Sequence, residues 1–249
     1  MATPREINRH MKSVGNIGKI TKAMKMVAAA RLRRAQEKAA ASRPYAIKIK
    51  EVLSNVVSDP SVLAGLDAKK HPLLQKREVQ KVGYLVLCSD KGLAGAYSSN
   101  ALKMAVAEIS ECEDEVVVIT CGRKARDFFT RRGFNVIQSH IGFSDRPTYE
   151  NAVDIAQDAI KTFANEGFDK LNIVYTVFKT ALSQVPTSEV ILPVEPPVKE
   201  EGKPQASFMF EPGEDDTLTV LAPKYLETVV YAALVQSAAS ELGSRMTAM

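Results

Sequence analysis

Small or apolar side chains recur at alternating spacings of three and four residues from the start of the chain to residue 56. The repeat stays close to a 3.5-residue period over about seven heptads, which is typical of a coiled-coil seam. A T-x-x-E capping box from Thr3 to Glu6, with Pro4 at the first helical position, marks the start. The pattern predicts one helix of roughly 80 Å, longer than a small domain can cover. Its seam positions are Ile7, Met11, Val14, Gly18, Thr21, Met24, Ala28, Leu32, Ala35, Ala39, Ser42, Ala46, Ile49, Leu53 and Val56.

Two features of this predicted helix are unusual. Pro44 lies inside it, and because a proline in a helix interior removes a hydrogen bond, we expect a kink or a short break there. The seam also uses small residues such as Gly18 and Ala28, where a dimeric zipper uses Ile, Val and Leu. Small residues bury little area, so the helix needs a partner helix of the same chain or an enclosing protein.

The middle of the chain alternates between two hydrophobic patterns. Apolar, β-branched runs of strand length occupy 81–89, 115–120, 134–140 and 170–178, and helical patterns lie between them at 93–110, 122–132 and 148–166. This alternation predicts a Rossmann-like α/β domain with a mostly parallel sheet covered by helices. We expect a further edge strand at 189–195, a short aromatic strand at 207–212 and a surface connection at 58–78.

A last helix follows the turn at 213–216, and Pro223 is expected to delay its regular part to about Lys224. Its second half is small and smooth, like the seam of the first helix. Matching seams at the two chain ends predict that these helices pair as a long antiparallel coiled coil, with the α/β domain inserted between them. The expected division is 1–58 and 213–249 for the terminal helices and 75–212 for the globular domain.

Composition and charge narrow the class of protein. Apolar residues make up 45% and charged residues 25%, which is ordinary for a globular protein. We find no run of 18 apolar residues and no apolar core of a signal peptide, so neither a transmembrane helix nor secretion is expected. Cys88, Cys112 and Cys121 form no CxxC pair, which argues against a disulfide framework or a zinc site. Cys88 and Cys121 are expected to be buried.

The positive charge is concentrated at the N-terminus. Residues 1–50 hold thirteen Lys and Arg against two Glu, a net charge of +11, and because the whole chain carries +4, the remainder carries −7. Such asymmetry favours an acidic partner, which leaves nucleic acid, a membrane surface or an acidic protein open. A bZIP-like basic region is the main alternative, but it needs a strong zipper after it. A membrane helix needs bulky residues opposite its cations. A slim rod inside an acidic protein fits better.

No catalytic constellation is evident in the sequence. The loop at 89–100 follows a strand and precedes a helix, as nucleotide-binding glycines do. However, Gly92 and Gly95 do not complete G-x-G-x-x-G, and a tight turn accounts for them. The carboxylates at 111–115 indicate a solvated turn. Because the glycine motif is incomplete, we expect no cofactor. Because the three histidines are scattered, we expect no metal.

Several segments, taken together, resemble the γ subunit of F-type ATP synthases. They are INRHMKSVGNIGKITKAMKMVAAARLRRAQ, ASRPYA, SDKGLAGAYSSN, SQVP and ASELGSRMTAM, in the order of the family. The family more often has a cysteine and a second glycine at Ala94 and Ala96. The resemblance implies a non-catalytic central stalk, or rotor, with ATP chemistry on its partners. Those partners are the α and β subunits of the catalytic hexamer, the ε subunit and the membrane ring of c subunits, with one copy of the stalk per complex and no nucleic acid.

The resemblance also implies roles for particular residues. Lys22, Met24 and Lys25, with Arg245 on the returning helix, match the region that meets an acidic lever of the β subunits. The segment with Phe208, Phe210 and Glu211 matches the foot that meets the membrane ring and the ε subunit. It further implies a peripheral position on the cytoplasmic side of a bacterial plasma membrane, and a last helix that in relatives continues beyond residue 249.

Overall fold

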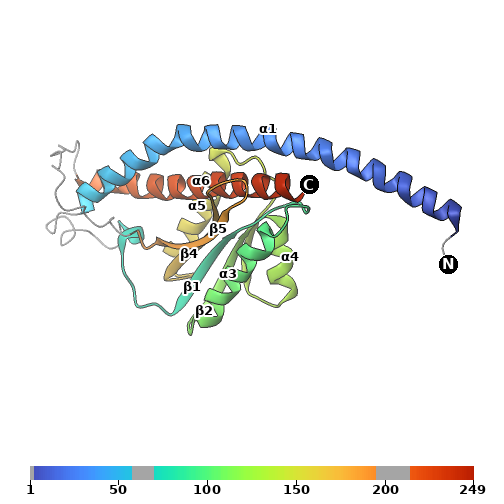
Figure 1. Cartoon of the computed structure of the whole chain (residues 1–249). Coiled ribbons are helices and arrows are strands. Elements are labelled where there is room, and N and C mark those ends of the chain that lie inside the picture. The colour runs from blue at the N-terminus through green and yellow to red at the C-terminus, as the bar shows by residue number, and fades with distance from the viewer. Residues whose placement is uncertain (1–2, 58–69, 195–213) are drawn as a thin grey trace.

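The computed structural model describes residues 3–57, 70–194 and 214–249. Two long helices, α1 (Pro4–Val57) and α6 (Glu214–Ala248), come from the two ends of the chain. Figure 1 shows them side by side and antiparallel, above a body of sheet and shorter helices. α1 extends well past the C-terminal end of α6. The predicted fold class, an α/β domain inserted between paired terminal helices, is confirmed.

The helix α1 is continuous through Pro44 (Figure 1), so the expected kink or short break is wrong. Beyond the proline, Ile49 and Leu53 are buried against the rest of the protein. Burying such a side chain contributes about 1.5–3 kcal/mol. Two of them offset the cost of about 3 kcal/mol for an interior proline. In Figure 1 the helix follows one gentle curve.

The helix α6 likewise begins ten residues before the expected start at Lys224, and it contains Pro223. Leu218 and Ala222, on the N-terminal side of the proline, are buried in the main hydrophobic core together with Leu226. This packing stabilises the first turns, and the proline is tolerated inside the helix. Sequence signals for helix breaking are overridden at both prolines by tertiary burial.

The predicted seam of α1 is confirmed from Thr21 to Leu53, where every seam position is buried or half-buried. α6 is the element that α1 contacts most extensively. Leu32 packs with Ala239 and Leu242 of α6. The first four seam positions, from Ile7 to Gly18, are exposed. The coiled coil of this structure therefore covers only the second part of α1.

The body contains a five-stranded sheet of order β3-β2-β1-β4-β5. The first four strands are parallel and β5 runs antiparallel to β4, which confirms a mostly parallel sheet. Their bounds are β1 Lys81–Leu87, β2 Glu115–Cys121, β3 Val136–His140, β4 Lys170–Phe178 and β5 Gln184–Leu192. A 3-10 helix, η1, covers Pro72–Leu74.

Helices cover both faces of this sheet. α3 (Tyr97–Glu111) and α4 (Arg123–Arg131) share one hydrophobic core with β1 and β2. α5 (Tyr149–Ala164) and α6 share the other core. α5 begins with a capping box between Thr148 and Asn151. Cys88 and Cys121 are buried as expected, and all three cysteines are free.

Two boundaries differ from expectation. β5 begins at Gln184 rather than 189, and it contains Pro186, which an edge strand tolerates because one side of its backbone is unpaired. α3 begins at Tyr97 rather than 93, because the preceding residues turn with positive φ at Leu93 and Gly95. The aromatic strand expected at 207–212 lies outside the described residues.

By length and composition, Asp216–Ala248 of α6 could cross a membrane, although the sequence contains no uninterrupted run of 18 apolar residues. Half of the 18-residue apolar window of this helix is buried inside the protein. It contacts α1, α5 and β4. This is the pattern of a core helix, whose apolar character is used for internal packing.

Candidate functional site: a free shaft and the junction at its base

The free shaft is the part of α1 that runs from Pro4 to Val27, up to the first fully buried seam position, Ala28. Six Lys and Arg lie on it against the single carboxylate of Glu6. Its apolar side chains are also unusually exposed: Met11 is 67% and Val14 is 65% exposed. The other large exposed apolar residues on it are Ile7, Ile17, Ile20, Met26 and Val27. Cations and uncovered apolar side chains together are typical of a surface that packs against another helix or another protein.

The residues expected to contact a β subunit fall in two different environments. Lys22 and Lys25 are exposed on the free shaft, and Met24 between them is half-buried. Arg245 is buried, and its guanidinium donates to the carboxylate of Glu241 and to the carbonyl of Gly92. Arg245 is therefore bound inside the protein, whereas the two lysines are open to solvent. The second expected contact, Phe208, Phe210 and Glu211, lies outside the described residues.

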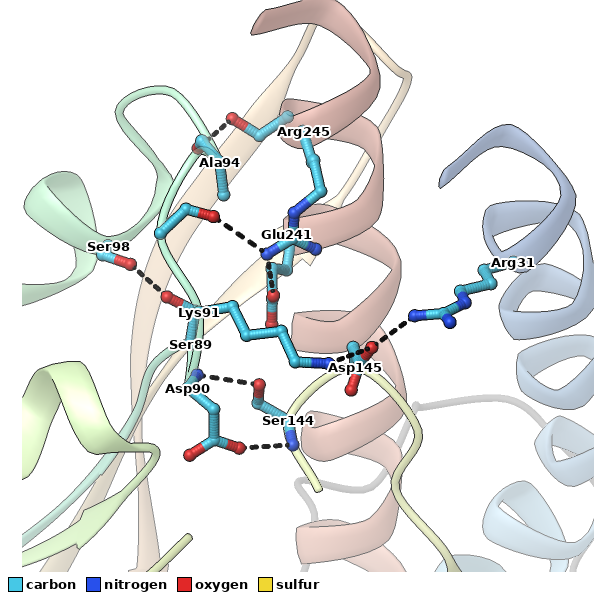
Figure 2. A network of polar contacts seen from close by, with 12 residues as sticks. Arg31, Ser89, Asp90, Lys91, Ala94, Ser98, Ser144, Asp145, Glu241 and Arg245 are labelled. Atoms are coloured by element: carbon cyan, nitrogen blue, oxygen red, sulfur yellow. Dashed lines mark hydrogen bonds and ion pairs between the residues drawn. The ribbon is translucent and has the colours of Figure 1, made fainter. Parts of the chain in front are cut away.

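A polar junction at the base of the shaft connects α1 to the body (Figure 2). Its centre is Asp145, in the loop between β3 and α5, whose side chain is only 9% exposed. Asp145 Oδ2 accepts hydrogen bonds from Arg31 Nη1 of α1 at 2.6 Å and from Lys91 Nζ at 3.1 Å. Burial alone would raise the pKa of Asp145, but Lys91 and Arg31 lower it below its usual value. One carboxylate thus joins α1 to two loops of the body.

Asp90 connects the loop after β1, which carries Lys91, to the loop between β3 and α5, which carries Asp145. Its carboxylate accepts backbone N–H bonds from Gly142 at 2.9 Å and from Ser144 and Arg123 at 3.0 Å. Its own backbone N–H donates to Ser144 Oγ. Burial raises the pKa of Asp90, but the three amides outweigh this effect and lower it. The loop that carries Asp145 is therefore fixed to the end of β1.

We expect Asp90→Asn to lower the free energy of unfolding by about 1–3 kcal/mol at pH 7, because the amide cannot accept all three bonds as an anion does. Since the folded-state pKa of Asp90 is lowered, its contribution is present above the unfolded value of about 3.9 and is lost as the pH falls through the folded value. Urea denaturation at neutral and acid pH measures both effects.

The matched control is Asp114→Asn, an exposed residue before β2, which we expect to change stability by less than about 0.5 kcal/mol. A difference between wild type and Asp90→Asn that stayed constant from neutral pH into acid would contradict the charge-based explanation.

α6 joins the same junction from the opposite side. Ser244 Oγ donates to the carbonyl of Ala94 at 2.8 Å, and Arg245 donates to Gly92. Glu241, which pairs with Arg245, is fully buried. Burial raises the pKa of Glu241, and the neighbouring Arg245 opposes this shift. The loop of residues 89–96 is thus held by α6 through its carbonyl groups.

This arrangement places α6 where a nucleotide binds in many open α/β sheets. In open α/β sheets, ligands bind beyond the carboxyl ends of the strands, where the strand order reverses. Here that point lies between β1 and β4, and α6 fills it. Ser240 donates to the carbonyl of Thr176 in β4, and Ser244 reaches the loop after β1. The positive φ of Leu93 and Gly95 agrees with the tight turn that was expected, and this turn also packs against α6 of the same chain.

Sequence reasoning missed the residues of this junction. Arg31 looked like one cation among many, and Asp145 lay in an ordinary polar turn. Glu241 was the only carboxylate in an otherwise small and apolar stretch of the last helix, and that contrast was the one usable signal. Among the described residues no cluster of three or more His, Cys, Asp or Glu is arranged to hold a metal.

The fold and the site define an α/β protein with a projecting basic helical shaft, braced by a polar junction. A family model described as ATP synthase matches residues 3–249. The chain belongs to the ATP synthase gamma-chain family.

Curated relatives agree with this assignment. The ATP synthase gamma chain of Brevibacillus brevis is 45% identical over 98% of this chain and 84% of the relative. That of Desulfitobacterium hafniense is 41% identical over the whole chain and 85% of the relative. Among solved structures, the central stalk and c-ring of the Tetrahymena thermophila mitochondrial ATP synthase matches with a TM-score of 0.68 at 23% identity. That match covers 92% of this chain and 97% of the other, and it supports the fold. These comparisons do not support the nucleic-acid alternative.

Proposed function

We propose that this chain is the central-stalk rotor of an F-type ATP synthase, which transmits rotation of the membrane ring to three catalytic β subunits. The gamma-chain relationship over the whole chain carries this proposal. In this function the chain is not itself catalytic, and ATP is made or hydrolysed on the partner β subunits. Proton flow turns the ring, the ring turns the shaft, and the shaft changes the β subunits in sequence.

The composition of the shaft suits this task. Its small seam residues keep the rod slim, so that it can turn inside a close-fitting sleeve of α and β subunits. Its cations, with Lys22 and Lys25 exposed, would attract acidic lever loops on the β subunits. A shaft can shift a β subunit between open and closed states only by as much as it interacts differently with the two. A curved, unevenly charged rod provides such a difference as it turns.

Torque must pass from the body to the shaft, and the junction supports this step. The Arg31–Asp145–Lys91 contacts link α1 to loops held by Asp90, and α6 packs along both α1 and the sheet. The proposed division assigns 1–58 and 213–249 to the shaft and 75–212 to the body. The body, including the segment with Phe208, Phe210 and Glu211, would contact the ε subunit and the c-subunit ring. One copy per complex would lie on the cytoplasmic side of the membrane.

We expect Lys22→Glu/Lys25→Glu to reduce the ATP hydrolysis of a reconstituted complex with α and β subunits by about tenfold, because like charges would face the acidic levers. Turnover and ATP-driven proton uptake into vesicles, measured together, separate slow rotation from loss of coupling. Arg245→Lys, which keeps the charge in a buried site, tests the role of the fourth expected contact.

Lys161→Glu, an exposed cation on α5 away from the shaft, is the matched control and should leave turnover unchanged. Equal activity of the shaft variant and this control would show that Lys22 and Lys25 are not the contact. The function itself fails if the tagged chain, expressed in its source cells, brings down neither α nor β subunits.

A further inference from the structure

A surface groove runs between α3 and α4 on the face of the sheet away from α6. We call it the α3–α4 groove. It has a volume of about 810 Å³, and α3 contributes residues from Ser98 to Ala107 while α4 contributes residues from Lys124 to Arg131. Figure 1 shows the two helices side by side in front of the sheet. One end of the groove is lined by residues 91–95, the loop that α6 holds through the carbonyl groups of Gly92 and Ala94, so this end is shared with the junction.

The floor of the groove is apolar. Leu102 is buried beneath it, and Val106 and Phe128 are half-buried in its walls. At one end Leu93 is 69% exposed. The guanidinium of Arg132 lies over the ring of Phe128, so the apolar surface open to a partner is that of Leu93 and of the exposed parts of Val106 and Phe128.

Five cations border this floor: Lys91, Lys103, Lys124, Arg131 and Arg132. The groove contains a single carboxylate, Asp127, which pairs with Arg126 outside it. Lys103, Lys124 and Arg131 form no ion pair with any residue that the structure describes. The groove thus has an unbalanced positive charge, complementary to an acidic partner.

The shape of the groove selects the kind of acidic partner. Both helices follow parallel strands, so they run in the same direction and the cations are spread along them rather than gathered at one point. The stretch from Ser98 to Ala107 measures about 14 Å at 1.5 Å per residue. A small anion would need converging cations, whereas carboxylates on successive turns of a helix match cations spaced along two banks.

We propose that the α3–α4 groove binds an acidic amphipathic helix of a partner protein. The apolar stripe of that helix covers Leu93, Val106 and the exposed part of Phe128, and its flanking carboxylates meet the lysines and arginines on both banks. A helical stretch of about nine residues, or two and a half turns, matches the length of the groove, and a peptide of 14 residues extends about one turn beyond it. This interaction is separate from the shaft, so it would add a protein contact to those proposed for the body with the ε subunit and the c-subunit ring.

A synthetic peptide of 14 residues, with Leu at helical spacing and Glu elsewhere, tests the proposal directly. Fluorescence anisotropy with the full chain at near-physiological salt should give at least about tenfold tighter binding than the same peptide with Lys replacing Glu. Lys103→Glu/Arg131→Glu should weaken the Glu peptide by about tenfold or more. Raising the salt to 1 M should weaken it as well, because exposed charges are screened.

Arg5→Glu/Arg9→Glu, on the free shaft, is the matched control and should leave the affinity within about twofold. Circular dichroism and thermal unfolding confirm that both double variants fold. Equal affinity for the two peptides, or a loss on the shaft variant in place of the groove variant, would overturn the proposal. Saturable binding of inorganic pyrophosphate at the groove without peptide binding would also overturn it and assign a small-anion site.

Discussion

Glu241→Ala is expected to lower the free energy of unfolding by about 3–5 kcal/mol, because it leaves a buried guanidinium without its partner. Both side chains of the Glu241–Arg245 pair are less than 10% exposed. The remaining acceptor, the Gly92 carbonyl, makes only a long contact of 3.4 Å with Arg245. Chemical denaturation of the full chain, followed by circular dichroism, measures the loss.

The double variant Glu241→Leu/Arg245→Met separates two effects on stability: the penalty for leaving one buried charge unpaired, and the net contribution of the intact ion pair. A buried ion pair replaced by apolar side chains of similar size is often nearly neutral in stability. We therefore expect the double variant to be more stable than Glu241→Ala. A double variant that is no more stable would mean that specific polar contacts to the 89–96 loop, rather than an unpaired charge, account for the loss.

Gly122→Ala is expected to lower the free energy of unfolding by about 3 kcal/mol or more. This variant tests the packing between the ends of β1 and β2. Gly122 has φ of +98°, and a Cβ at this position would lie 2.3 Å from the carbonyl oxygen of Cys88. That oxygen belongs to the backbone, so relief requires the strand ends to separate. Thermal and urea unfolding of the purified variant measure the effect.

Gly133→Ala provides the matched control. Gly133 also has a positive φ, of +75°, but a Cβ there would meet nothing within 4 Å. Gly133→Ala should lower the free energy of unfolding by only about 1–2 kcal/mol, the cost of a left-handed backbone conformation in a residue with a Cβ. If the two variants were equally destabilised, the close approach to Cys88 would not be the reason for glycine at 122.

Much of the fold could be predicted from periodicity. The seam predicted for α1 matches the buried face from Thr21 to Leu53, because a helix that packs along a partner must present one stripe to it. The strands β1, β2 and β4 are evident as β-branched runs because most of their residues are buried, whereas β3 at the edge of the sheet is half-exposed and partly polar. The small residues of the α6 seam correctly indicated a close approach between the chain ends.

The prolines show where local signals fail. Pro44 and Pro223 have the same local effect in any helix, yet both are accommodated because Ile49, Leu53 and Leu218 are buried around them. The start of β5 was missed because its first residues are polar, and pairing with Phe178 of β4 extends the strand. In each case contacts from distant parts of the chain outweigh the local preference.

The sequence by itself determined the long basic helix, the alternating strands and helices of the body and the gamma-chain resemblance, because these depend on spacing along the chain. Only the tertiary structure decided which charges are free and which are paired. Lys22 is exposed on the shaft. Arg31 instead pairs with Asp145, which is distant in the sequence, and Arg245 pairs with Glu241 one helical turn away. The sequence gives the charge of a side chain, but its partner and its exposure to water depend on how remote segments pack.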